Sequence, residues 1–236
     1  MTTAAIVQAR LGSSRLPGKV LCELAGRSVL DHVLTRCKLI ASADVVVCAM
    51  PDEDASNAIE EVALGRGVQT FRGSEKDVLG RYFSAAKSVD ASIILRVTSD
   101  CPLIDPDICE EVLMLRKRSG ADYASNVENR SFPRGLDCEA FTYAALELAE
   151  ANATEPDDRE HVTPWLRRTQ SIRRENLSSG QSTLAAHRWT LDYSEDLAFL
   201  RALFETMPVD DNVRMKDVLE FLNRNPEIAQ INACRR

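Results

Sequence analysis

Four short apolar runs in the first hundred residues are continuous rather than alternating. They cover residues 4–9, 44–50, 68–71 and 92–98. Such runs are typical of strands that are covered on both faces of a sheet. Between them, apolar residues recur at helical spacing around 29–37, 59–63 and 78–86. Strands that alternate with helices predict an α/β fold with a mostly parallel sheet and right-handed crossovers.

Two of these predicted helices have an N-terminal capping pattern. Ser28 is followed by Asp31, and Ser74 by Asp77, in each case a hydroxyl with an acid three residues later. This spacing is typical of a helix start, so both serines are predicted caps.

The second half of the chain is less regular. Strands are predicted at 122–126, 136–141 and 188–192, with a polar loop at 127–135. Helices are predicted at 143–151, 157–169, around 197–204, and at 213–224. Pro164 falls inside the second of these helices and either kinks it or marks its true start.

Composition excludes several classes of protein. The 236 residues are 44% hydrophobic, which fits one large α/β domain better than two small ones. A net charge of -7 and a pI near 5.1 argue against a general nucleic-acid surface. No run of about 18 apolar residues occurs, so we expect no export signal, no membrane partner and a cytoplasmic protein. The seven cysteines include no CxxC pair, which predicts reduced structural thiols and disfavours zinc.

The segment from Arg10 to Lys19, after the first predicted strand, reads Arg-Leu-Gly-Ser-Ser-Arg-Leu-Pro-Gly-Lys. Glycines let backbone N–H groups approach phosphate oxygens, and Arg and Lys neutralise their charge. The interval from Gly12 to Gly18 is one residue too long for a P-loop, and Val20 stands where the magnesium hydroxyl would be. The loop therefore predicts a phosphate site of another kind, or else an ordinary basic turn.

Carboxylates follow two later strands. Asp100 comes after the run at 92–98 and can hold Mg²⁺ opposite the basic loop. Asp192, after the run at 188–192, could complete such a site. Glu195 and Asp196 are instead assigned to the start of the next helix.

Other polar residues have weaker assignments. Asp105 and Asp107 spell the D-x-D of many glycosyltransferases, but Asp105 is predicted to cap a helix. A further polar group could read a second substrate, or could simply be solvated: Arg134, Asp137, Glu139, Arg159 and His161. His32 and His187 are expected to be structural.

Several motifs together resemble the cytidylyltransferases that activate sugar acids, of the ketodeoxyoctonate and acylneuraminate type. The resemblance is strongest to the branch called spore-coat polysaccharide biosynthesis protein F. It rests on segments in the same order along nearly the whole chain, namely residues 6–19, 71–82, 96–106, 135–139, 159–163 and 191–197.

The resemblance implies a Rossmann-like, three-layer α/β/α nucleotidyltransferase fold and the transfer of CMP from CTP with release of pyrophosphate. Residues 1–236 would form one domain with an acceptor-binding and dimerising excursion at about 122–187, and the protein would be a homodimer. Binding of the nucleotide is carried over to Arg10, Gly12, Ser13, Ser14, Arg15, Lys19, Asp77 and Arg81. Arg15, Lys19 and Asp100 inherit catalytic roles, and Asp100 with Asp192 would ligate Mg²⁺.

The acceptor side departs from the family. Ketodeoxyoctonate enzymes carry a His-x-Gly-x-Tyr stretch where this chain has residues 135–141, so the small-molecule acceptor stays open between a sugar acid and a related sugar derivative. Two other functions are also open: a nucleotide-sugar glycosyltransferase of the same fold and an inactive nucleotide-binding homologue. A receiver-like signalling domain fits less well, because such domains are about half this length and keep an acidic pocket near the first strand.

Overall fold

The computed structural model describes residues 1–235, which fold around a seven-stranded sheet. The strands lie in the order β5-β4-β1-β6-β8-β7-β9. Their bounds are β1 Thr2–Gln8, β4 Val45–Pro51, β5 Gln69–Gly73, β6 Ala91–Thr98, β7 Tyr123–Ser125, β8 Glu139–Thr142 and β9 Arg174–Asn176. Only β8 runs antiparallel to its neighbours in this sheet, so the prediction of a mostly parallel sheet is confirmed.

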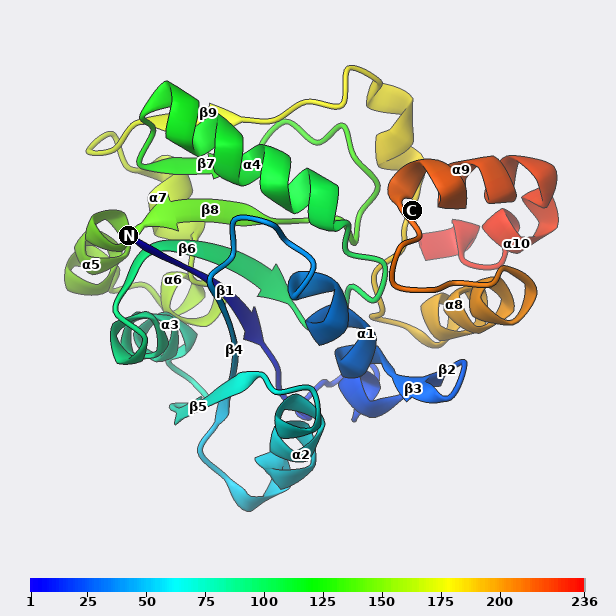
Figure 1. Cartoon of the computed structure of the whole chain (residues 1–236), viewed down its shortest axis with the longest axis horizontal. Coiled ribbons are helices and arrows are strands. Elements are labelled where there is room, and N and C mark those ends of the chain that lie inside the picture. The colour runs from blue at the N-terminus through cyan, green and yellow to red at the C-terminus, as the bar shows by residue number, and fades with distance from the viewer. Residues whose placement is uncertain (236) are drawn as a thin grey trace.

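Helices cover both faces of the sheet and make three layers (Figure 1). One face packs against α3 Val78–Ser88, α5 Tyr143–Asn152, α6 Pro156–His161 and α7 Pro164–Arg168. The other face carries α1 Val29–Cys37, α2 Asn57–Gly65, α4 Pro106–Ser119, α8 Ser194–Thr206, α9 Met215–Arg224 and α10 Pro226–Gln230. Shorter elements are η1 Lys19–Leu21, η2 Asp54–Ser56, η3 Ser182–Ala186, η4 Ala233–Arg235 and the hairpin of β2 Glu23–Leu24 with β3 Arg27–Ser28.

The continuous apolar runs are strands because both of their faces are buried. In β1, Ala5 and Val7 enter the core beneath α1, whereas Ala4 and Ile6 enter the core beneath α3. Burial at every position removes the alternation expected of a strand with one solvated face. The three-layer α/β/α fold is therefore confirmed.

Several local predictions need correction. Residues 188–192 form no named strand, and only Arg188 makes a bridge, to Arg134. The helix expected at 157–169 is two helices, because Val162 has a φ of 70° and Pro164 starts a new turn. Ser28 does cap α1, but Asp77 rather than Ser74 caps α3, by accepting from the N–H of Gly80 at 3.0 Å.

The predicted excursion at 122–187 contributes three strands to the main sheet. β7, β8 and β9 all pair within it, and β8 joins directly to β6. Its assignment to acceptor binding and dimerisation stays a prediction. Over residues 1–235, no helix combines the length and the apolar character that crossing a bilayer requires.

Candidate active site

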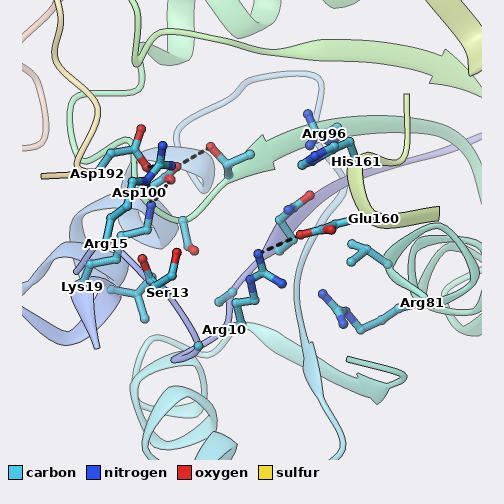
Figure 2. A pocket seen from close by; sticks show the side chains of 18 residues that line it. Arg10, Ser13, Arg15, Lys19, Arg81, Arg96, Asp100, Glu160, His161 and Asp192 are labelled. Carbon is cyan, nitrogen blue, oxygen red and sulfur yellow. Dashed lines mark hydrogen bonds and ion pairs between the residues drawn. The ribbon is translucent and has the colours of Figure 1, made fainter. Parts of the chain in front are cut away.

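A cavity of about 410 Å³ opens where the parallel strands end. In an open parallel sheet, this edge is where ligands bind. Figure 2 shows two groups of labelled side chains in it, with Arg10 between them. One group is Ser13, Arg15, Lys19, Asp100 and Asp192, and the other is Arg81, Arg96, Glu160 and His161.

The loop after β1 has a fixed conformation at the first end of the cavity. The N–H of Gly18 donates to the carbonyl of Leu11 at 3.1 Å, and Leu16 N–H donates to the hydroxyl of Ser13 at 3.3 Å. Gly18 has a φ of 69°, which a glycine adopts without strain, and Lys19 then begins η1. The closed loop lines the cavity with Gly12, Ser13 and Ser14.

Two carboxylates converge on one ammonium group at this end. Lys19 Nζ lies 2.6 Å from Asp100 Oδ2 and 2.9 Å from Asp192 Oδ1. Asp192 also accepts from Arg15 at 2.9 Å and from Arg188 at 2.9 Å. Asp100 and Asp192 are 92 residues apart in the sequence, but their side chains meet at a single point.

The charges of these groups stabilise one another. Burial by itself would lower the pKa of Lys19, but Asp100 and Asp192 more than offset it, so the pKa lies above its ordinary value. Burial would likewise raise the pKa of Asp192, yet hydrogen bonds from Lys19 and Arg188 hold that pKa below its usual range. At neutral pH this end of the cavity therefore holds the Lys19 ammonium ion beside the ionised carboxylate of Asp192.

The segment that carries Asp192 is fixed by backbone bonds rather than by a strand. Leu191 N–H donates to the carbonyl of Asp100 at 2.8 Å, which ties the two acidic segments together. Asp196 is fully buried and accepts from the N–H of Asp192 at 3.0 Å, and it caps α8 as predicted. Arg188 bridges Asp192 and Asp196 with three hydrogen bonds of 2.9 Å, one to Asp192 and two to Asp196.

Gly135 is required by this arrangement. Its φ is 106°, and an added Cβ would lie 2.6 Å from the backbone nitrogen of Thr190 and from the carbonyl carbon of Trp189. We expect Gly135→Ala to cost about 2–3 kcal/mol and to lower Tm by roughly 5–10 °C in thermal unfolding, because backbone must shift. Gly120→Ala is the control, since Gly120 also has a positive φ, 66°, with nothing near its Cβ; its expected cost is about 1 kcal/mol. Equal losses in the two variants would contradict a role for close packing at Gly135.

The other end of the cavity contains polar atoms that lack partners. Gln8 Oε1, Arg81 Nε and Arg96 Nε are buried without a hydrogen bond, and all three residues line the cavity. Arg10 reaches across to Glu160 at 3.2 Å. Because a buried polar group without a partner is costly, these atoms are expected to bond to a ligand or to water.

Arg96 is held by a buried acid. Glu139, with a side chain only 2% exposed, accepts from Arg96 at 2.5 Å and from Arg167 at 2.7 Å. The hydroxyls of Tyr123 and Thr163 also donate to it, at 2.5 and 3.2 Å. Burial would raise the pKa of Glu139, but the charges of Arg96 and Arg167 lower it to about 2. Glu139 therefore orients Arg96 from behind and does not line the cavity.

Most of the predicted site residues come together here. The cavity is lined by Arg10, Gly12, Ser13, Ser14, Arg15, Lys19, Arg81, Asp100, His161 and Asp192. Five others lie outside its lining, namely Asp77, Arg134, Asp137, Glu139 and Arg159.

Four of those five form ion pairs within the protein, and those of Glu139 are described above. Arg159 donates to Asp77 at 2.8 Å and also pairs with Glu150, so it links α6 to α3 and α5. Asp137 pairs with Arg130 across the loop before β8.

The D-x-D reading finds no support in the geometry. Asp105 caps α4 as predicted and accepts from Met215 N–H at 2.7 Å, and Asp107 pairs with Arg214 at 3.1 Å. Neither acid lines the cavity. His32 is buried with its Nε2 2.9 Å from the carbonyl of Leu24, which confirms its structural assignment.

Four residues that line the cavity were not predicted as site residues from the sequence, namely Gln8, Arg96, Thr98 and Glu160. The first three had a signal, because each is a polar residue in an otherwise apolar, buried strand. In register, Gln8 lies beside Thr98, and Arg96 is two residues before Thr98, so all three share a face. Glu160 lies in a helix with many charged residues and had no comparable signal.

A basic, glycine-containing loop that faces two carboxylates across the carboxyl edge of a parallel sheet defines an enzyme that handles a nucleoside polyphosphate. Comparison with known proteins agrees with this class. The sequence profile described as cytidylyltransferase matches residues 4–211, so the chain belongs to the cytidylyltransferase family and is a nucleotidyltransferase.

Individual proteins show the same relationship. The chain is 31% identical to the spore coat polysaccharide biosynthesis protein SpsF of Bacillus subtilis, over 95% of each sequence. It is similar to the structure of a cytidylyltransferase from Leptospira borgpetersenii, with a TM-score of 0.91 and 32% identity, covering 98% of this chain and 97% of the other. The CMP:2-keto-3-deoxy-manno-octonic acid synthetase in complex with CTP shares the fold at a TM-score of 0.66 and 19% identity, covering 87% of this chain and 99% of that one.

Proposed function

We propose that this enzyme transfers CMP from CTP to a sugar acid or a related acceptor, with Mg²⁺ and with release of pyrophosphate, in the biosynthesis of a surface polysaccharide or glycoconjugate. The observation that carries the proposal is the convergence of Asp100 and Asp192 on one point beside the basic loop. The names of the relatives support it, since one is named for polysaccharide biosynthesis and the synthetase of the same fold binds CTP.

The residues present fit a magnesium ion. Lys19 Nζ shows that a single cation can reach oxygens of both Asp100 and Asp192. Residues 1–235 contain no cluster of three His, Cys, Asp or Glu side chains that could hold a metal. Two carboxylates with phosphate oxygens and water form the ligand set that Mg²⁺ prefers at nucleotide sites, rather than an all-protein cage.

The protein side of the reaction follows from these positions. The N–H groups of the closed loop and the side chains of Arg15 and Lys19 bind the triphosphate and fix its orientation. An acceptor hydroxyl then attacks the α-phosphorus, the bond to the bridging oxygen of pyrophosphate breaks, and the hydroxyl proton passes to solvent. Lys19 and Arg15 stabilise the charge that develops on the departing pyrophosphate. Mg²⁺, when bound by Asp100 and Asp192, would supply charge neutralisation at the α-phosphoryl oxygens.

The end of the cavity lined by Arg81, Arg96 and His161 is where we expect the protein to recognise the features of a substrate that set it apart from similar molecules. The Nε of Arg96 is without a partner, and so is the Oε1 of Gln8, which lies opposite Thr98 on the same face of the sheet, two residues along β6 from Arg96. A guanidinium group suits a carboxylate, and a side-chain amide suits a hydroxyl. His161 and Arg81 line the same end.

The test is pyrophosphate release from each of the four nucleoside triphosphates with Mg²⁺ and a panel of sugar acids and sugar phosphates. We expect turnover with CTP and a sugar acid. Absence of both CTP binding and turnover across the panel would overturn the proposal. A parallel incubation supplies a nucleotide sugar in place of the triphosphate, and glycosyl transfer there without pyrophosphate release would instead identify a glycosyltransferase. CTP binding without any turnover would fit the inactive homologue. The predicted homodimer is tested separately by sedimentation.

A further inference from the structure

The ammonium group of Lys19 occupies the point where the two carboxylates of the proposed metal site converge. It is 2.6 Å from Asp100 Oδ2 and 2.9 Å from Asp192 Oδ1, and its side chain is only 13% exposed. A divalent ion bridging the same oxygens would lie at nearly the same place. Two cations cannot share it, because like charges at contact distance repel strongly.

We propose that the Lys19 ammonium group occupies the metal position in the nucleotide-free enzyme and moves to the triphosphate when nucleotide binds, so that metal ion and nucleotide bind cooperatively. The inference rests on the proposed function. Lys19 has a flexible four-carbon stem and a compact charge, so it can turn from the carboxylates to phosphate oxygens without a backbone change. The carboxylates would then be released for the metal at the moment when the nucleotide supplies its remaining ligands.

The neighbouring contacts indicate why Lys19, rather than Arg15, has this role. Arg15 reaches only Asp192, and its side chain is 52% exposed and stacks 5.0 Å from the centre of the Tyr193 ring. Asp100 has one other side-chain oxygen or nitrogen partner among the described residues, the hydroxyl of Thr98 at 2.6 Å, which carries no charge. Among residues 1–235, only Lys19 therefore pairs with both acids at once.

The arrangement has a reciprocal consequence. If nucleotide binding removes the competing ammonium group, nucleotide strengthens metal binding, and metal must strengthen nucleotide binding by the same factor. A free protein that keeps Lys19 in place binds divalent ions weakly. Loss of the ammonium group would raise the affinity of the free protein for metal and weaken the coupling.

The experiment measures Mn²⁺ binding to the nucleotide-free protein by electron paramagnetic resonance of the unbound ion. We expect Lys19→Met to lower the Kd for Mn²⁺ at least tenfold. Arg15→Met removes a positive charge that contacts the same Asp192 oxygen, but it leaves the Lys19 ammonium group between the two carboxylates. We expect it to change the Kd for Mn²⁺ less than threefold. Lys117→Met, on the exposed surface of α4, is the matched control and should leave Kd unchanged. Lys19→Gln repeats the test if the methionine variant does not fold.

A second measurement compares CTP binding calorimetrically with Mg²⁺ and with EDTA. In the wild type, Mg²⁺ should tighten CTP binding by a factor at least several-fold larger than in Lys19→Met. The role of Lys19 would be overturned if wild type and Lys19→Met bound Mn²⁺ equally tightly. It would also be overturned if Lys19→Met and Arg15→Met increased the affinity for Mn²⁺ by the same factor. Failure of the wild type to bind CTP with Mg²⁺ would overturn the proposed function instead, because the Mn²⁺ comparison uses no nucleotide.

Discussion

Replacing Asp100 with asparagine is expected to lower the turnover number for pyrophosphate release on the order of a thousandfold. The substitution keeps the volume of the side chain and an oxygen that can accept from Thr98, but it removes one of two charges that converge at 2.6 and 2.9 Å from Lys19. The proposed Mg²⁺ would keep only one of its two anionic protein ligands. The measurement is the initial rate with saturating CTP and Mg²⁺.

The matched control for this variant is Asp107→Asn. Asp107 lies seven residues later, is 70% exposed and pairs only with Arg214 in the described structure. Its substitution should leave the turnover number within about twofold, since the charge lies outside the cavity. A near wild-type rate for Asp100→Asn would show that the carboxylate pair is not the centre of the reaction.

The second large effect is expected for Glu139→Gln, which should lower the free energy of unfolding by about 3–5 kcal/mol at pH 7. Glu139 is the buried acid shared by Arg96 and Arg167, and glutamine would leave the guanidinium groups without a counter-charge. Because Arg96 lines the cavity, the variant that remains folded should also bind substrates less well. Chemical denaturation followed by circular dichroism gives the stability.

The pH dependence provides a sharper test. The folded-state pKa of Glu139 is lowered from 4.5 to about 2, so its contribution is complete above about pH 4.5 and is lost as the pH falls toward 2. The stability difference between wild type and Glu139→Gln should therefore shrink by about 3 kcal/mol between pH 5 and pH 2. Glu128→Gln, in the exposed loop after β7, is the control for loss of a carboxylate outside the buried network. A constant difference between wild type and Glu139→Gln would mean that Glu139 is not ionised in the buried network.

The sequence predicted the site best where chemistry and strand ends coincide. The loop from Arg10 to Lys19 follows a buried strand, and Asp100 follows another, so topology alone brings them to one edge of the sheet. Asp192 required the resemblance as well, because the strand expected before it is absent. Its position depends instead on the buried Asp196 and on the backbone contact with Asp100.

The acceptor side was predicted less well, because charge pairing cannot be derived from residue type. In the sequence, Arg159 and Glu139 are candidate substrate-binding residues. In the structure, Arg159 forms an ion pair with Asp77, and Glu139 forms ion pairs with Arg96 and Arg167. Arg96, conversely, lies in a strand that reads as apolar core. Its exposure to the cavity follows only from the register of β1 and β6.

The sequence by itself determined the α/β alternation, the helix caps at Ser28 and Asp105, and the basic, glycine-containing character of the first loop, since these depend on local spacing and residue type. Only the tertiary structure decided which acids meet Lys19, which arginines are neutralised by buried carboxylates and which polar atoms face the cavity. Those outcomes depend on contacts between distant segments, such as Lys19 with Asp192, which are 173 residues apart, and local sequence carries no record of such contacts.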